Sequence, residues 1–235
     1  MGSRLNAKPW RHDSYTLNRL QVALENAISD LVSQNILRDQ DSLVLDIGAG
    51  DAPYRDLFRN YAKRYLACDL EAGPNIDLVF KEGEPLDLPS GIADCVLSAQ
   101  VLEHVWDLDA YLGECRRCLT ADGRLLISTH GTWLYHPHPG DYRRWTRDGL
   151  CRELESRGFE VVAIRPVVGP LAWTTQFRTL AYHRVLSALG GLGRLVASGV
   201  CLLMYLRMRV EDRVTPKSLR DSNAAVYVVT ARVKQ

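Results

Sequence analysis

Hydrophobic side chains recur along this chain with a period that changes several times, and each change marks the boundary of a predicted element. Over residues 15–36 they return every three or four positions, which predicts an amphipathic helix with one buried face. The same spacing predicts shorter helices over 52–60, 108–119 and 147–157. Residues 1–14, before the first helix, are mostly polar, so we expect them to be poorly ordered.

Short apolar runs between these helices predict buried strands. They cover residues 42–47, 64–69, 93–98, 124–129, 160–165 and 225–233. Residues 120–123 have the composition of a turn that leads into a strand. Strands that alternate with helices indicate βαβ units and a mostly parallel sheet with helices on both faces. We therefore expect an N-terminal segment and helix over 1–40, followed by one α/β domain over 41–235.

The most apolar stretch, 185–206, does not fit this alternation. Arg194 interrupts it and leaves an unbroken run over 195–206, which is shorter than the roughly 20 residues that a membrane-spanning helix needs. Five basic residues follow it closely: Arg207, Arg209, Arg213, Lys217 and Arg220. Three interpretations stay open: a helical insert (about 171–210) that packs on the domain or covers a pocket, a hairpin (185–210) on an anionic membrane surface, and a true span.

Composition narrows the class of protein. With 46% hydrophobic and 24% charged residues, the 235-residue chain resembles globular proteins rather than disordered or multi-span membrane proteins. A net charge of +1 disfavours nucleic acid as a partner. Six cysteines are too few for a disulfide-built fold, and the first ten residues hold no apolar run typical of a signal peptide. We expect a cytoplasmic protein. The apolar stretch leaves open a peripheral location at the membrane.

An apolar strand ends in Asp46 and runs directly into a Gly-Ala-Gly turn at 48–50. Glycines there permit a sharp turn and the close approach of a ligand. A dinucleotide fingerprint needs a third glycine where this chain has Pro53, and no Tyr-x-x-x-Lys pair occurs, so a nicotinamide oxidoreductase is disfavoured. Asp69, at the tip of the next strand, is placed to accept ribose hydroxyls. An adenosine with a cationic part and no pyrophosphate fits this pattern, as in S-adenosylmethionine.

With these residues the sequence resembles the class I S-adenosylmethionine-dependent methyltransferases, in the branch that carries a VLEHV motif. The matching segments are VLDIGAG (44–50), YLACDL (65–70), GEPLDLPSGIADCVLS (83–98), VLEHV (101–105), TADGRLLIS (120–128), GFEVVAI (158–164) and AVYVVTARV (225–233). The resemblance implies a Rossmann-like, seven-stranded, mostly parallel sheet in the order 3-2-1-4-5-7-6, with the last strand antiparallel and a helical insert before it. It also implies S-adenosyl-L-methionine as the cofactor.

The resemblance assigns cofactor-binding roles to particular residues. Those implied to contact the methionine part are Asp46, Gly48, Ala49, Gly50 and Gln100. Those implied to contact the adenosine are Asp69, Leu70 and Glu84. The family usually has Asp where this chain has Glu84, so that contact is expected to be longer or absent. Glu103 and His104 invite a general-base interpretation, but their position at a helix start favours a role in fixing the loop around the cofactor.

The loop after the fifth strand, 130–146, is rich in aromatic and titratable side chains and is the expected acceptor site. The candidate catalytic residues are His130, His136, His138 and Asp141. The candidate substrate-binding residues are Trp133, Tyr135, Tyr142, Arg143 and Trp145. A neutral histidine can take the proton of an acceptor hydroxyl, and His136 or His138 is favoured over His130. Asp141 is expected to pair with Arg143 or Arg144, and Thr146 to cap the following helix.

The predicted activity is methyl transfer to an oxygen of a small-molecule or glycan-like acceptor. Amino-group methylases generally carry an Asn/Asp-Pro-Pro-aromatic run after the fourth strand, where this chain has SAQV (98–101). A similar loop occurs in bacterial members associated with sugar and cell-envelope biosynthesis. The alternative, which Glu84 keeps open, is a catalytically inactive methyltransferase-like binding or membrane-associated protein. No metal is expected. Cys115 and Cys118 lack a second Cys or His pair, and His136 and His138 lack a third ligand.

Overall fold

Strands and helices alternate through residues 4–38, 41–137 and 140–234, the parts of the chain that the computed structural model describes. The strands are β1 (Leu43–Ile47), β2 (Arg64–Asp69), β3 (Leu78–Val79), β4 (Ala93–Ala99), β5 (Leu119–His130), β6 (Phe159–Val167) and β7 (Val226–Val233). The helices are α1 (Ser14–Ser33), α2 (Arg55–Phe58), the 3-10 turn η1 (Leu102–His104), α3 (Leu108–Cys118), α4 (Arg147–Ser156), α5 (Pro170–Ser187), α6 (Gly190–Val214) and α7 (Lys217–Ser222).

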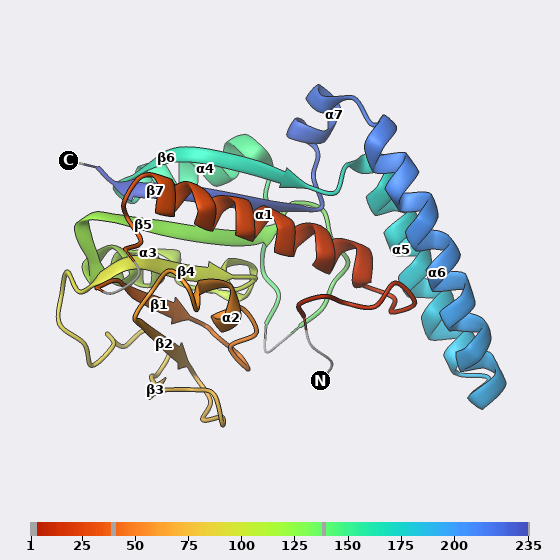
Figure 1. The fold of residues 1–235 in the computed structure, drawn as a ribbon, viewed down its shortest axis with the longest axis horizontal. Helices are drawn as coiled ribbons and strands as arrows, with labels where there is room; N and C mark the ends of the chain where they lie inside the picture. The colour runs from red at the N-terminus through yellow and green to blue at the C-terminus, as the bar shows by residue number, and fades with distance from the viewer. Residues whose placement is uncertain (1–3, 39–40, 138–139, 235) are drawn as a thin grey trace.

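The strands form one sheet in the order β3-β2-β1-β4-β5-β7-β6 (Figure 1). Strands β1 to β5 pair in parallel, whereas β7 is antiparallel to both β5 and β6. This confirms the predicted Rossmann-like fold and its strand order. The carboxyl ends of β1, β2, β4 and β5 therefore share one edge of the sheet, where ligands bind in open α/β folds.

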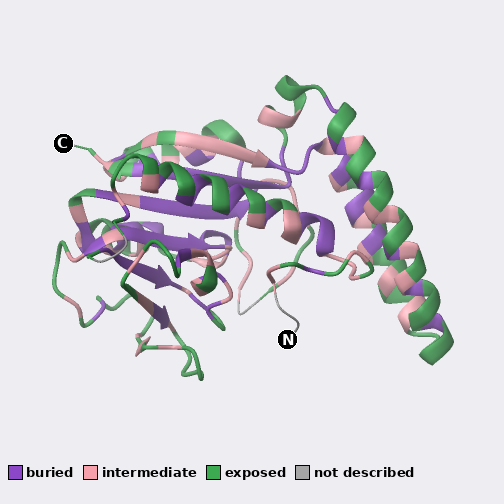
Figure 2. Cartoon of the chain, in the orientation of Figure 1, coloured by how far each residue is buried: buried purple, intermediate pink, exposed green. Residues whose placement is uncertain are grey.

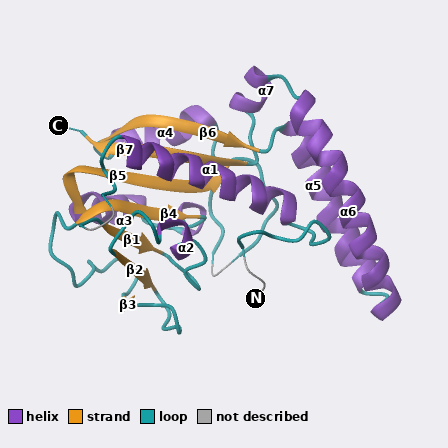
Figure 3. Cartoon of the chain, viewed as in Figure 1, coloured by secondary structure: helices purple, strands orange, loops and turns teal. Residues whose placement is uncertain are grey.

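Side chains of β1 alternate between two hydrophobic cores because successive residues of a strand point to opposite faces. Leu43, Leu45 and Ile47 join the core that α3 and α4 cover, while Val44 joins the core that α1 covers. Helices thus lie on both faces of the sheet, and the central strands are buried along their length (Figures 2 and 3). Cys115 and Cys118 lie in the α3 core, fully buried.

Two local predictions need correction, and the residues of one short strand were not predicted. Residues 120–123 are part of β5 rather than a turn: Leu119 pairs with Ala93 and Arg124 with Cys95, so the chain bulges between the two pairs. The helix predicted over 52–60 is the single turn α2. Strand β3 contains two residues, too few to show a hydrophobic period. The resemblance implied its place in the sheet, but not which residues form it.

The N-terminal segment is ordered over the described residues 4–13, contrary to prediction. Ala7 is buried, and its carbonyl oxygen accepts a hydrogen bond from Asn18 Nδ2 of α1 at 2.9 Å. The carbonyl of His12 accepts from Gln176 Nε2 of α5 at 2.6 Å. Polar side chains of distant helices therefore hold this segment through its backbone.

The apolar stretch forms the second half of a helical hairpin. Helices α5 and α6 run side by side beyond the carboxyl edge of the sheet, and their turn points away from the domain (Figure 1). Buried Asp212 fixes the base of the hairpin: its carboxylate accepts the Gly169 N–H at 2.8 Å and the Tyr15 O–H at 3.1 Å. Further along the hairpin, the N-terminal segment and α1 contact α5 at Gln176 and α6 at Tyr205.

Helix α4 begins with the predicted cap, which provides a test of its contribution. Thr146 Oγ1 accepts the Gly149 N–H at 3.1 Å. Thr146→Ala should lower the free energy of unfolding by about 1 kcal/mol, because one amide of the first helical turn loses its partner. Thr174→Ala on α5 is the control, since that exposed hydroxyl donates only to a carbonyl of its own helix. Urea titration measures both; equal midpoints for the two variants would contradict the role of the cap.

Candidate active site

The turn after β1 brings the ends of three strands together. The N–H groups of Gly48 and Ala49 both donate to the Cys68 carbonyl of β2, at 2.8 and 3.0 Å. Gly48 has φ 78°, and a Cβ there would lie 2.7 Å from Val101, just after β4, so glycine is required by the conformation and by the contact. Gly50, at φ 61°, would have no atom within 4 Å of a Cβ. The outer side of the turn is therefore open to a ligand.

Asp46 lies directly below this turn and is buried. Its Oδ2 accepts the Tyr65 hydroxyl at 2.5 Å, whereas Oδ1 has no hydrogen-bond partner among the described residues. Burial raises the pKa of Asp46 to about 7. A cation beside Oδ1 would stabilise the carboxylate, so the group suits a positively charged ligand. Tyr65 was not identified from the sequence, where it looked like an ordinary strand residue.

Asp69 closes the other side of the turn. Its Oδ2 accepts the Gly50 N–H at 2.7 Å and its Oδ1 accepts the Leu70 N–H at 2.8 Å. Gln100 follows β4 with φ 60°, and its Nε2 donates to Ser128 Oγ at 3.2 Å. Seven of the eight residues proposed for the cofactor thus lie at one edge of the sheet: Asp46, Gly48, Ala49, Gly50, Asp69, Leu70 and Gln100.

Glu84, the eighth, has a different setting. It lies in the loop after β3, with its side chain 59% exposed and its carboxylate 3.6 Å from Lys81 Nζ. This ion pair is local to its own turn, in which the Glu84 N–H donates to the Lys81 carbonyl. The arrangement gives no support to a contact between Glu84 and an adenine at the glycine turn.

A cavity of about 530 Å³ opens beside the tip of the glycine turn. Asp51, Ala52 and Pro53 line it on the side of the turn, and Arg4 and Asn6 line it on the side of the N-terminal segment. The segment that was expected to be poorly ordered therefore forms one wall of this cavity. The sequence held no signal for this, because the segment has neither helical nor strand periodicity.

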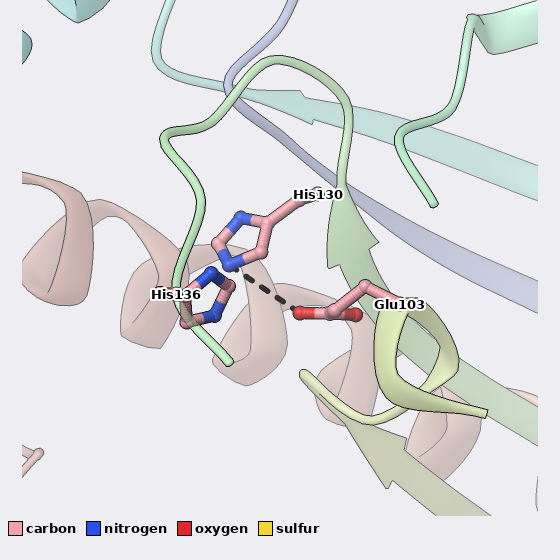
Figure 4. A group of neighbouring side chains, drawn as sticks. All are labelled: Glu103, His130 and His136. Carbon is pink, nitrogen blue, oxygen red and sulfur yellow. Dashed lines mark ion pairs between the residues drawn. The ribbon is translucent and has the colours of Figure 1, made fainter. Parts of the chain in front are cut away.

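At the carboxyl end of β5, His130 lies against a buried acid (Figure 4). Its Nε2 is 3.3 Å from Oε1 of Glu103, which comes from η1 and is completely buried. The other oxygen of Glu103 accepts the Thr129 hydroxyl at 2.7 Å. Burial raises the pKa of Glu103 and lowers that of His130 well below its usual value, so the imidazole is neutral at pH 7. Glu103, assigned to loop fixing from the sequence, therefore also contacts His130 at the end of β5.

His136 is the accessible histidine of this cluster, with 38% of its side chain exposed. Its ring lies edge-on to His130 and His104, at centroid distances of 4.9 and 5.0 Å. Its Nδ1 is 3.6 Å from Oδ2 of Asp141, which also accepts the His136 backbone N–H. Burial lowers the pKa of His136 below its usual value. His138 lies outside the described residues.

Asp141 pairs with Arg144, one of the two predicted partners. The guanidinium donates to both carboxylate oxygens, at 2.5 and 2.7 Å, and this holds the pKa of Asp141 well below its ordinary value. Asp141 thus stays ionised beside His136. An imidazolium formed at His136 would be stabilised by this charge.

The predicted substrate-binding residues divide into two groups. Tyr135 and Tyr142 are exposed, and Trp133 is half-buried, stacked on His130 with ring centroids 5.0 Å apart. Trp145 instead packs in the hydrophobic core with 7% of its surface exposed, so its prediction as a substrate contact is wrong. Arg143 donates to the backbone carbonyls of Val105 and Trp106, which gives it a structural role in tying the loop to η1.

The same cluster offers a donor set for a cation. The ligand atoms of Glu103, His130 and His136 all lie within 4.8 Å of one another. Two neutral imidazoles and a carboxylate could hold a divalent transition metal ion. Of the two histidines that were considered as metal ligands from the sequence, His136 and His138, the set includes His136. Its other members are His130, at the end of β5, and Glu103, in η1.

Comparison with known proteins connects this geometry to a family. A family model for the methyltransferase domain matches residues 20–164. The chain is 30% identical over 133 residues to a probable S-adenosylmethionine-dependent methyltransferase of Mycolicibacterium smegmatis, covering 50% of this chain and 52% of that protein. It is 29% identical over 167 residues to one of Mycobacterium tuberculosis, covering 65% of this chain and 58% of that protein. The matched region is little more than half the length of either relative.

Among solved structures, the chain resembles the 1,6-didemethyltoxoflavin-N1-methyltransferase of Burkholderia thailandensis, which holds 1,6-didemethyltoxoflavin and S-adenosylhomocysteine. The TM-score is 0.55 at 19% identity, and the match covers 95% of this chain and 85% of that one. At this identity the likeness shows a shared fold.

The buried Asp46 and Tyr65 pair can be tested through stability. Tyr65→Phe leaves the Asp46 carboxyl buried without its donor, and should lower the free energy of unfolding by about 1–3 kcal/mol. Tyr61→Phe is the control, because that side chain is 38% exposed. Chemical denaturation followed by circular dichroism measures the change. If both variants unfolded at the wild-type midpoint, the hydrogen bond would have no part in holding the site together.

Proposed function

The chain belongs to the class I S-adenosylmethionine-dependent methyltransferases, and from this premise we propose that it methylates a hydroxyl oxygen of a small-molecule or glycan-like acceptor. The observation that carries the proposal is the shared sheet edge, where an open glycine turn with a buried acid lies near a cluster of neutral histidines. The inactive alternative is not favoured, because the glycine turn and both acids that flank it are intact.

The residues at the turn fit the cofactor. The open side of Gly50 leaves room for an extended ligand, and the unpartnered Oδ1 of Asp46 suits the ammonium of a methionine moiety. The Asp69 carboxylate retains a lone pair for a ribose hydroxyl beyond the three backbone amides whose hydrogen bonds it accepts. When bound, S-adenosylmethionine supplies an electrophilic methyl group on a sulfonium. The task of this chain is then to hold donor and acceptor in line and to take the acceptor's proton.

His136 is the proposed base. It is neutral at pH 7, it is more accessible than His130, and Asp141 beside it would stabilise the imidazolium once the acceptor proton has moved. His130, with only 5% of its surface exposed, packs behind it. We assign His130 and Glu103 to holding the His136 ring in place.

Aromatic faces around His136 suit a ring-shaped acceptor. Trp133 lies stacked on His130, and Tyr135 and Tyr142 are exposed on the same loop. Flat apolar rings pack well against the faces of sugars and phenols, while polar groups on the loop can orient their hydroxyls. These features support an oxygen acceptor on a sugar or aromatic ring.

The role of Asp46 predicts a pH-dependent affinity for S-adenosylhomocysteine, measurable by calorimetry. Because the free carboxyl has a pKa of about 7, it is protonated at lower pH and must lose that proton before it pairs with an ammonium. Affinity should therefore fall as pH falls from 7.5 to 5.5, by up to about tenfold per unit. Asp46→Asn should weaken binding about tenfold or more at pH 7.5 and remove the pH dependence.

The matched control is Asp148→Asn, which removes an 88% exposed acid on α4 and should leave affinity unchanged. A wild-type affinity that is flat over this pH range would contradict the assignment of Asp46.

The role of His136 predicts a defect confined to turnover. His136→Asn should lower kcat by about 10²–10⁴ with an unchanged Kd for S-adenosylhomocysteine, whereas His183→Asn on α5 should leave both unchanged. The wild-type rate at saturating cofactor should be level from pH 7 to 8.5 and fall only below about pH 6.5, because the pKa of His136 is lowered. Release of S-adenosylhomocysteine with a panel of sugars, phenols and amines measures the rate.

Two outcomes would overturn this assignment. Turnover of amines with none of the hydroxyl compounds would exclude the oxygen acceptor. Activity that a chelator removes and zinc restores would assign the histidine cluster to a metal ion instead of a base.

A further inference from the structure

Helix α6 presents an apolar face with no partner among the described residues. At 3.6 residues per turn its exposed apolar residues lie on one side of the helix and form one stripe, here called the apolar stripe: Leu192, Leu195, Val196, Leu202, Leu203, Leu206 and Val210. The opposite face of the helix buries Ala197, Cys201 and Met208 against the rest of the protein. Leu192, Leu195 and Leu203 are 76%, 71% and 67% exposed, and the outer side of α6 is largely exposed in Figure 2.

The stripe lies on the part of the hairpin that stands away from the sheet (Figure 1). From Leu192 to Leu206 it extends about 21 Å, at 1.5 Å per helical residue. Val185 and Leu189, exposed by 66% and 71%, continue the apolar surface around the turn of the hairpin. Such a surface is costly in water unless something covers it.

The net charge of the hairpin indicates what covers the apolar stripe. Residues 170–222 hold eight Lys and Arg against three Asp and Glu, a net charge of +5 in a chain whose total is +1. Of the three acids, Asp212 is buried and Glu211 pairs with Arg207 at 2.7 Å. At 3.6 residues per turn, exposed Arg207 and Arg209 lie on opposite flanks of the C-terminal end of the stripe, and exposed Arg213 continues its line beyond Val210. An apolar strip between basic flanks matches the interface of an anionic bilayer.

We propose that the α5–α6 hairpin anchors this protein on an anionic membrane surface, with the apolar stripe in the lipid interface and the flanking arginines among the headgroups. This goes beyond the proposed methyl transfer and does not depend on it. The long aliphatic parts of arginine allow the charged ends to stay among headgroup phosphates while the stripe sinks between the lipids.

The packing of the hairpin favours a surface position over a span. By length and composition α6 is the one helix among the described residues that could cross a membrane, but 22% of that window is buried in the protein. Asp212 of the same helix bonds to Gly169 and Tyr15 inside the domain. A span would require α6 to leave these contacts, whereas a surface position requires no change in the fold.

A second copy of the chain fits the stripe less well. In a symmetric contact the same patch meets itself, so the arginines of one flank would face those of the other copy. Glu211, the acid of α6 nearest the stripe apart from buried Asp212, has 17% of its side chain exposed and already pairs with Arg207. The contact would therefore bring basic flanks together without acids to neutralise them.

Co-sedimentation of the full chain with lipid vesicles tests the proposal. Wild type should pellet with vesicles of phosphatidylcholine and phosphatidylglycerol, less with pure phosphatidylcholine, and less in high salt. The variant Leu195→Glu/Leu203→Glu should bind anionic vesicles at least tenfold more weakly. The control Val22→Glu/Val162→Glu adds the same charge at exposed sites on α1 and β6, and should bind as wild type does. Unchanged S-adenosylhomocysteine affinity in both variants shows that they are folded.

Two results would overturn the proposal. The first is a wild-type protein that stays in the supernatant with anionic vesicles, or a Leu195→Glu/Leu203→Glu variant that pellets as fully as the wild type. The second is a dimer by light scattering that this variant dissociates without any vesicle binding, because a second copy would then cover the stripe.

Discussion

The site depends on the absence of a side chain at one position. At Gly48 the backbone turns with a positive φ, donates to the end of β2 and touches Val101 after β4, so the ends of three strands meet at a single residue. A Cβ there would lie 2.7 Å from the Val101 side chain, so one of the two residues would have to shift. Val101 directly precedes η1, which carries Glu103. The contact at Gly48 therefore joins the glycine turn to the segment that leads into the histidine cluster.

Burial shifts the pKa values of the ionisable groups at this edge of the sheet. Asp46 Oδ1, Glu103 Oε1 and His130 Nδ1 are all buried without a hydrogen-bond partner among the described residues. Such groups are costly to fold, and a structure tolerates them where the surrounding sheet leaves them no alternative position. Their shared consequence is that carboxyls bind protons more tightly and imidazoles less tightly than in water. The edge therefore has a buried carboxyl that suits a cation at the glycine turn, and neutral imidazoles that can accept a proton at the end of β5.

Much of the fold could be predicted because a sheet buried on both faces leaves continuous apolar runs, and the glycine turn has a recognisable spacing. The rest depended on contacts between distant residues. Thr129 and Glu103 meet across 26 positions, and His12 and Gln176 across 164, so neither the role of the acid nor the order of the N-terminal segment was visible locally. Trp145 was misjudged for the same reason: an aromatic residue in a loop looks available until tertiary packing buries it.

Aromatic rings behind the histidines connect the site to the α5–α6 hairpin. His130 stacks on Trp133, and Trp133 meets Phe177 of α5 edge-on at 5.8 Å, with Trp173 of the same helix beyond it. One row of aromatic contacts therefore joins α5 to the histidine cluster. A substitution that removes the ring of Phe177 would take away the group that Trp133 packs against on the side away from His130.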